Sequence, residues 1–259
     1  MDSLHIAAGA LTGFVVGMTG VGGGALMTPI LVLTFGTAPL TAVGTDLWFA
    51  AITKIAVTGL HVRKGLIDWP IVRRLWLGSL PAAALTLVWM GSRSVDRSST
   101  FVEAAIGVAV CLTALGLLAE RLFAADRSTG SRASHDGNAS WQRWGTVIAG
   151  AVLGALVTLT SVGAGALGAL ALLTLYPSRL TAHRLVGTDI AHAIPLALVA
   201  GAGHLSIGQV DPALLRDLLI GSIPAALTGA VVSSHVPHGA LRLILGGVLL
   251  AVGLTMLAR

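Results

Sequence analysis

A glycine run inside an uncharged stretch decides the fold. Residues 17–26 read GMTGVGGGAL, and no Asp, Glu, Lys or Arg occurs between Asp2 and Asp46. A helix of about 20 residues already crosses the hydrocarbon core of a bilayer, so this stretch is longer than one span requires. Glycine costs roughly 1 kcal/mol relative to alanine inside a helix. We therefore expect two half-helices, over residues 4–18 and 25–35, flanking a glycine-lined turn.

The composition is that of a membrane protein. The chain has 259 residues, of which 55% are hydrophobic and only 10% are charged, whereas a soluble domain carries about 25% charged residues. Further apolar segments cover residues 47–60, 75–90, 101–118, 147–176, 190–204, 218–232 and 241–257. None of these segments alternates as a barrel strand would, so the sequence predicts an all-α polytopic membrane protein.

The positive net charge of +5 comes from short Lys and Arg clusters between apolar runs. Few aromatic residues are interleaved with them, so the pattern follows the positive-inside rule and does not indicate nucleic-acid binding. No Lys or Arg precedes the first apolar run, so we expect no cleaved signal peptide. The single cysteine, Cys111, allows no internal disulfide and is expected to be a small buried hydrophobe.

The two halves of the chain resemble each other. Three pairs of segments match: VGTD at 43–46 and 186–189, GSLPAA at 78–83 and GSIPAA at 221–226, and VGGGAL at 21–26 and VGAGAL at 162–167. The first two pairs share one offset and the third pair differs from it by two residues. The sequence therefore predicts two homologous repeats of about four apolar segments each, and each repeat opens with a glycine-broken helix or re-entrant hairpin.

The repeats set the predicted domain organisation. We expect an N-terminal membrane repeat over residues 1–124, a polar cytoplasmic linker over 125–140 and a C-terminal membrane repeat over 141–259. If the broken helices are hairpins, each half has three crossings, the repeats are inverted, and 11 Lys and Arg residues are cytoplasmic against 4 outside. Eight full crossings would give 10 against 5. Both arrangements obey the positive-inside rule, and we favour inverted hairpins.

An ordered set of motifs resembles the sulfite exporter TauE/SafE family. The set comprises GVGGG at 20–24, Pro29, AVGTD at 42–46, His61, Gly65, Gly78, Ser79 and Pro81, with counterparts in the second half. The resemblance implies a bacterial inner-membrane transporter for sulfite, sulfoacetate, thiosulfate or related sulfur anions. The halves also differ, because the first triple glycine becomes Gly163-Ala164-Gly165 and Lys54 is matched by Ala197.

The broken helices are the predicted substrate site. Their residues are Gly22, Gly23 and Gly24 in the first half and Gly163, Ala164 and Gly165 in the second. Paired interruptions in duplicated halves are typical of transporters that bind substrate at the repeat interface. Free backbone N–H groups and the positive end of a helix dipole favour an anion. The alternative is close helix packing through small residues.

The two Thr-Asp motifs offer further polar groups. Thr45 and Thr188 can donate hydrogen bonds to sulfonate oxygens, and Asp46 and Asp189 can accept them or carry coupled protons. Two unprotonated carboxylates beside a dianion are unfavourable, so we expect at least one to hold a proton if they line the site. The alternative is that each motif caps the next helix.

Lys54 and His192 are the remaining predicted substrate ligands. Lys54 lies inside the apolar run 47–60, where a cation costs roughly 2.5 to 3.5 kcal/mol, and a counter-charge for an anionic substrate explains it. The alternatives are an ion pair with Asp46 or snorkelling to an interface. His192, which replaces Phe49 of the other half, can donate to an oxyanion or relay a proton, and its alternative role is a helix–helix hydrogen bond.

The other repeated polar residues predict turns. His61, His204, Asp68 and Asp211 flank Gly65 and Gly208 between segments. No third ligand accompanies them at a suitable spacing, so we expect turns and helix caps here, with no metal and no cofactor.

The sequence thus predicts a secondary transporter, an exporter of sulfite or a small organosulfonate, that is proton-coupled and works by alternating access. An anion channel would use the same groups without an occluded state, and another small anion such as thiosulfate is a second alternative. No His-Glu-x-x-His, Gly-x-Ser-x-Gly or ATP-binding motif occurs, so we expect neither an enzyme nor a primary pump. The expected partners are the anion and the lipid bilayer; a homodimer is compatible with the sequence, although no residue requires one.

Overall fold

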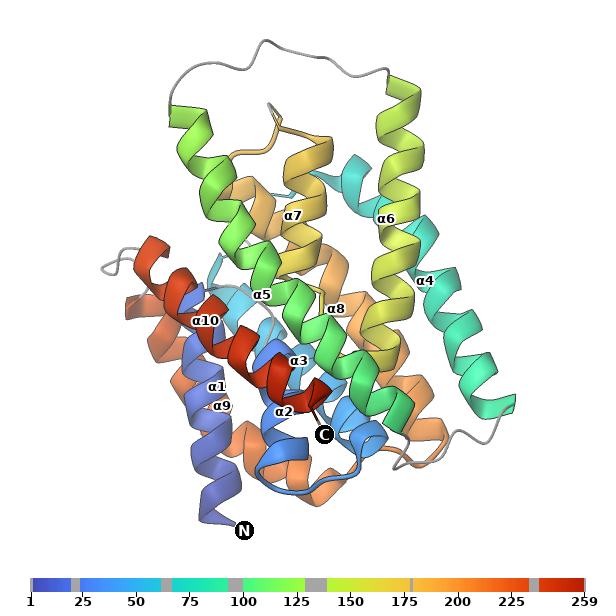
Figure 1. Cartoon of the computed structure of the whole chain (residues 1–259), viewed down its shortest axis with the longest axis vertical. Coiled ribbons are helices and arrows are strands. Elements are labelled where there is room, and N and C mark those ends of the chain that lie inside the picture. The colour runs from blue at the N-terminus through green and yellow to red at the C-terminus, as the bar shows by residue number, and fades with distance from the viewer. Residues whose placement is uncertain are drawn as a thin grey trace.

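The computed structural model is built from helices. It describes residues 2–19, 24–61, 67–92, 100–128, 139–177, 179–232 and 238–258, and within these ranges it contains ten helices and no strand (Figure 1). The helices are α1 (Ser3–Thr19), α2 (Gly24–Leu33), α3 (Pro39–His61), α4 (Trp69–Ser92), α5 (Thr100–Ser128), α6 (Ala139–Thr160), α7 (Ala166–Leu175), α8 (Ala182–Ser206), α9 (Pro212–Val232) and α10 (His238–Leu257). The all-α prediction is confirmed.

Six of these helices, α3, α4, α5, α6, α8 and α9, are long and apolar enough to cross a membrane. Large apolar side chains on the outer faces, such as Leu77 and Leu85 on α4 and Ile244 on α10, are exposed in the monomer. In water such surfaces would be unfavourable, but against lipid they are not. The fold is therefore that of a polytopic membrane protein.

At both places where the sequence predicts a broken helix, the structure has two separate helices. In the first pair, α1 ends at Thr19 and α2 begins at Gly24, so Gly22 and Gly23 lie outside the described residues. In the second pair, α6 ends at Thr160 and α7 begins at Ala166, with Gly163 at φ 116° between them. The turn between them begins at Ser161, which has φ 58°, and the φ of Gly163 lies in a region rarely open to residues with a side chain, so glycine is favoured at this position. Figure 1 shows α7 running back toward the end of the molecule at which α6 begins.

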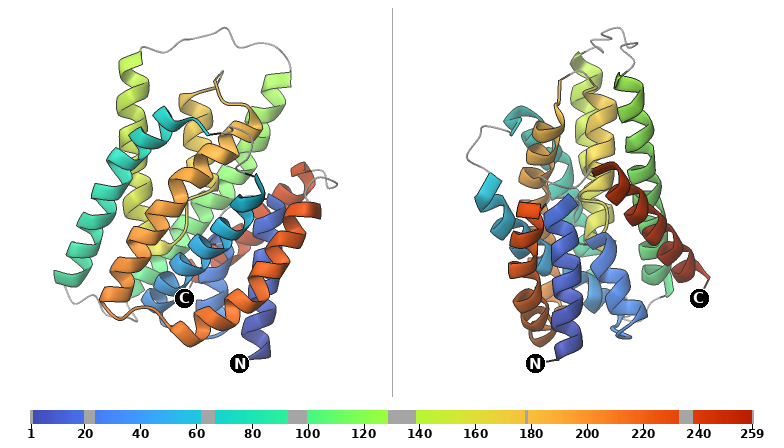
Figure 2. Two further views of the ribbon diagram at one scale, coloured as in Figure 1. Left: turned by 180° about the vertical axis from the view of Figure 1, so that it is seen from behind. Right: turned by 90° about the vertical axis from the view of Figure 1, so that its left-hand side faces the viewer.

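Glycines bring two helix pairs into backbone contact. A Cβ at Gly13 of α1 would collide with the backbone of Ser222 on α9, and a Cβ at Gly154 of α6 would collide with Ser79 on α4. The α1 and α9 helices lie side by side in both views of Figure 2. Both begin at the end of the molecule that carries the N-terminus, whereas α4 and α6 begin at the opposite end (Figure 1).

Helices α3 and α8 pack against each other between these two pairs. Their facing side chains form much of the core, including the fully buried Phe49 and Leu196. The predicted linker is partly helical at its edges, because α5 continues to Ser128 and α6 begins at Ala139. Its remaining residues, 129–138, lie outside the described part of the chain.

Candidate functional site

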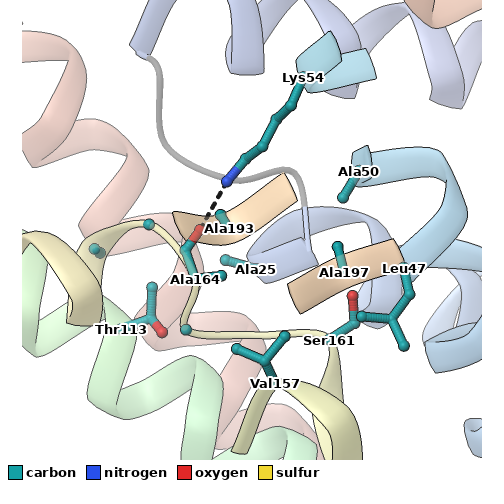
Figure 3. A pocket seen from close by; sticks show the side chains of 13 residues that line it. Ala25, Leu47, Ala50, Lys54, Thr113, Val157, Ser161, Ala164, Ala193 and Ala197 are labelled. Atoms are coloured by element: carbon teal, nitrogen blue, oxygen red, sulfur yellow. Dashed lines mark hydrogen bonds between the residues drawn. The ribbon is translucent and has the colours of Figure 1, made fainter. Parts of the chain in front are cut away.

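Lys54 lies in the interior of the protein on α3. Its side chain is 5% exposed, and its Nζ donates a hydrogen bond of 2.9 Å to the carbonyl oxygen of Ala164 (Figure 3). Ala164 belongs to the irregular turn, residues 161–165, that joins α6 to α7. The burial of the ammonium group disagrees with snorkelling, in which the charged group stays in water. A predicted substrate ligand and a predicted glycine turn are thus in direct contact.

A small cavity lies beside this contact. Lys54, Gly163, Ala164 and Gly165 line it, and its volume is about 20 Å³, which has room for about one water molecule. Positions that match between the halves line it in pairs: Ala25 with Ala166, Ala50 with Ala193, and Lys54 with Ala197. The cavity therefore lies where equivalent segments of the two halves meet, and only one half supplies a charge.

The turn also places a helix N-terminus at the cavity. Gly165 is the N-cap residue of α7 and makes no side-chain capping hydrogen bond. Gly165 and Ala166 both line the cavity, so the positive end of the α7 dipole is close to the Lys54 ammonium group. A buried cation beside a helix N-terminus is an arrangement that attracts an anion. On the other side, Ala25 brings the start of α2 to the cavity, directly after Gly24.

The two aspartates are buried inside helices. Asp46 is 0% exposed and Asp189 is 4% exposed, and each lies seven residues after the first residue of α3 or α8. The capping alternative for the Thr-Asp motifs is therefore wrong, and Thr181 caps α8 by accepting a hydrogen bond from Arg184 N.

Lys54 links the two carboxylates electrostatically. It interacts with Asp189 and, less strongly, with Asp46. Asp46 Oδ2 accepts a hydrogen bond of 2.6 Å from the Thr28 hydroxyl. The other oxygen of Asp46 and Oδ1 of Asp189 have no hydrogen-bond partner among the described residues. Neither aspartate lines the cavity. In this conformation their carboxylates therefore influence the cavity only indirectly, through their electrostatic interaction with Lys54.

The two threonines bind backbone of the opposite half. Thr45 Oγ1 accepts a hydrogen bond of 3.1 Å from Asp211 N, and Thr188 Oγ1 accepts one of 3.0 Å from Asp68 N. Neither threonine lines the cavity. Their hydroxyl groups therefore join the halves in this conformation, and their predicted contact with substrate stays a prediction.

His192 is buried on α8, and its Nε2 is hydrogen-bonded to the Ser79 hydroxyl of α4 at 3.0 Å. It does not line the cavity. This geometry agrees with the helix–helix alternative, and its substrate role stays a prediction. His204 is similarly engaged, because its Nε2 donates to the carbonyl oxygen of Thr158 at 2.8 Å.

Asp211 and Asp68 occupy matching positions but differ in their contacts. Asp211 Oδ1 accepts hydrogen bonds from the backbone of Ala213 and Leu214, so it caps α9 as predicted. Asp68 is 3% exposed and receives two hydrogen bonds of 2.9 Å from the guanidinium group of Arg179. This bidentate ion pair ties the start of α4 to the loop between α7 and α8. Sequence analysis gave no indication of it, because the partners are far apart in the chain.

We expect the Asp68–Arg179 ion pair to stabilise the folded protein. Asp68→Asn should lower the free energy of unfolding by about 1 to 3 kcal/mol, because the buried side chain loses its charge pair while the half-exposed Arg179 is re-solvated. The apparent melting temperature of the detergent-purified protein measures this. The matched control is Asp211→Asn, which weakens only a helix cap. Equal melting temperatures for Asp68→Asn and the unsubstituted protein would contradict the assignment.

Two polar residues of the cavity were missed in the sequence analysis. Thr113 of α5 and Ser161 of the α6–α7 turn both line the cavity. Thr113 lies within an apolar run whose helical rotation is not fixed by periodicity, and Ser161 precedes the glycine motif. No pattern in the sequence distinguishes either residue from its neighbours.

Comparisons with known proteins agree with this architecture. Residues 5–256 match a family model described as "Sulfite exporter TauE/SafE". The "Probable membrane transporter protein YjnA" of Bacillus subtilis (strain 168) is 35% identical over 258 residues, which cover 96% of this chain and 97% of that protein. The "Probable membrane transporter protein YdhB" of the same organism is 27% identical over 237 residues, 90% of each chain. No solved structure matches the chain. The family and these relatives are described as transporters, not as enzymes.

Proposed function

Because the chain belongs to the sulfite exporter TauE/SafE family of membrane transporters, we propose that it is a secondary transporter for sulfite or a small organosulfonate such as sulfoacetate. It works in the cell inner membrane and exports its substrate. The observation that carries this proposal is the buried Lys54 ammonium group, which contacts the Ala164 carbonyl beside a cavity at the N-terminus of α7. This cavity is the proposed substrate site.

Two inverted repeats account for the position of the cavity. The α1–α9 and α4–α6 pairs make the same glycine contacts, as Gly13 with Ser222 and Gly154 with Ser79 illustrate. The pairs begin at opposite ends of the molecule (Figure 1), which is the relation expected between inverted repeats. We infer that residues 1–124 and 141–259 are these repeats, and that the cavity lies on their pseudo-twofold axis.

The size of the cavity favours a transporter over a channel. A volume of about 20 Å³ holds about one water and excludes a sulfur oxyanion. Substrate binding therefore requires the halves to move apart, and the described conformation is closed around the proposed site. A channel would present a continuous path. The Asp68–Arg179 ion pair lies at the end of the molecule that we infer to be cytoplasmic, and we expect it to open when the site faces that side.

Counterflow in proteoliposomes tests the proposal. Vesicles loaded with sulfite should accumulate labelled sulfite from outside, transiently and with saturation, because an alternating carrier exchanges bound substrate one molecule at a time. Empty vesicles should not accumulate it. A conductance without exchange would support the anion channel instead. Exchange of thiosulfate but not of sulfite or sulfoacetate would assign a different sulfur anion.

A further inference from the structure

The cavity beside Lys54 is lined by a threonine whose hydroxyl group has no hydrogen-bond partner among the described residues. Thr113 of α5 is 1% exposed and lines the cavity, and its Oγ1 has no hydrogen-bond partner among the described residues. A buried hydroxyl left unpaired is unfavourable, because it loses its hydrogen bonds to water and gains none in the protein. Figure 3 shows Thr113 and Lys54 entering the region of the α6–α7 turn from different helices. The two side chains therefore approach the cavity from separate directions.

Several other helical threonines of this protein use their hydroxyl groups within their own helix. The hydroxyls of Thr86, Thr146, Thr158, Thr160 and Thr255 each donate to the carbonyl oxygen four residues earlier. This is the usual bond of a threonine within a helix. Thr113 does not make it. Ser161, the second hydroxyl-bearing residue that lines the cavity, likewise has no hydrogen-bond partner among the described residues. It belongs to the same α6–α7 turn as Ala164, the hydrogen-bond partner of Lys54, whereas Thr113 comes from a separate helix, α5.

Thr113 adds a directional donor to a site whose other attractions are electrostatic. The Lys54 ammonium group and the α7 dipole attract any small anion, halides included. A threonine hydroxyl binds only an acceptor that lies at hydrogen-bonding distance in the direction of its O–H bond. The oxygens of a sulfite or sulfonate group surround the sulfur, so one can contact Lys54 while another contacts Thr113. A halide is a single atom, so it cannot place one acceptor at Lys54 and a second acceptor at Thr113.

We propose that Thr113 is a specificity-determining residue that donates a hydrogen bond to a second oxygen of the substrate and so selects oxyanions over halides. This inference rests on the proposed function, because it concerns the same cavity. In the closed structure the space admits about one water. The substrate oxygen takes the place of that water when the site opens.

The test compares Thr113→Val, which keeps the side-chain shape but removes the hydroxyl, with Thr113→Ser, which keeps the hydroxyl. Sulfite and chloride affinities are measured by titration calorimetry on the full-length protein in detergent. We expect Thr113→Val to weaken sulfite binding about 10-fold or more, since a hydrogen bond to a charged group is lost. Chloride affinity should stay unchanged, and Thr113→Ser should bind sulfite nearly as the unsubstituted protein does.

Thr12→Val is the matched control. Thr12 of α1 is also buried with an unpartnered hydroxyl, but it does not line the cavity, so its loss should leave both affinities unchanged. Unchanged sulfite affinity in Thr113→Val, or equal losses for sulfite and chloride, would overturn the inference. If Thr113→Val is not monodisperse, Thr113→Ala is measured in its place under the same criteria.

Different results would contradict the proposed function and the role of Thr113. If the unsubstituted protein binds no sulfur oxyanion, the proposed function fails. If it binds sulfite and Lys54→Ala does not, while Thr113→Val binds normally, only the role of Thr113 is wrong.

Discussion

A protein carrying Lys54→Ala should lose sulfite affinity by about 30-fold or more while it still inserts into the membrane and remains monodisperse. Removing one partner of a desolvated charge pair costs about 2 to 5 kcal/mol in binding, and each 1.4 kcal/mol is a factor of ten. Lys54 is buried against the Ala164 carbonyl, so the substrate pairs with an ammonium group from which water is already excluded. The loss is measured as the sulfite-induced rise in melting temperature and by titration calorimetry.

Two further variants separate charge from packing. Lys54→Met keeps an unbranched side chain in the space but has no charge, so it should lose affinity as Lys54→Ala does. In the double variant Lys54→Ala/Ala197→Lys the ammonium group moves to the matching position of the other half. Ala197 lines the same cavity and is 6% exposed, so the double variant should recover part of the affinity. Sulfite affinity unchanged in both Lys54→Ala and Lys54→Met would remove Lys54 from the site.

The glycine interruptions and the buried lysine were accessible to sequence reasoning because each violates a strong local rule. Gly163 breaks a helix in an otherwise helical segment, and Lys54 puts a charge in an apolar run. The helices that resulted, α1 (Ser3–Thr19) and α2 (Gly24–Leu33), agree closely with the predicted residues 4–18 and 25–35. The capping alternative for Asp46 and Asp189 was wrong because α3 and α8 begin two turns earlier, at Pro39 and Ala182, in weakly hydrophobic sequence.

The rest of the site depends on how helices rotate and cross, which periodicity does not fix when nearly every residue is apolar. Thr113 lies inside a run of hydrophobic residues, and only the packing of α5 against α7 places this residue at the cavity. The Asp68–Arg179 pair joins residues that are 111 positions apart. His192, a predicted substrate ligand, is directed by the rotation of α8 toward Ser79 on α4, and its substrate role stays a prediction.

The second prediction concerns the balance of charge among the buried residues Lys54, Asp46 and Asp189. Lys54 is a single cation that interacts with two buried carboxylates, Asp46 and Asp189, so one buried carboxylate is in surplus. We expect Asp46 to be the surplus carboxylate, and its Oδ2 accepts a hydrogen bond from the Thr28 hydroxyl. A buried carboxylate without a counter-charge is unfavourable and takes up a proton. We expect that protonation of Asp46 removes its repulsion of an entering anion and thereby couples proton and anion movement.

Asp46→Asn should therefore uncouple the two fluxes. The amide has the shape of the protonated acid but cannot release a proton, so sulfite exchange should persist within about threefold while the accompanying pH change falls to background. A pH-sensitive dye inside proteoliposomes measures the pH change during sulfite flow, and Asp211→Asn, at the surface, is the control. In the unsubstituted protein sulfite affinity should fall as the pH rises, because deprotonated Asp46 restores the repulsion; Asp46→Asn should remove that dependence. An undiminished pH change in Asp46→Asn would contradict this role for Asp46, and the same experiment on Asp189→Asn would show whether the proton is carried there instead.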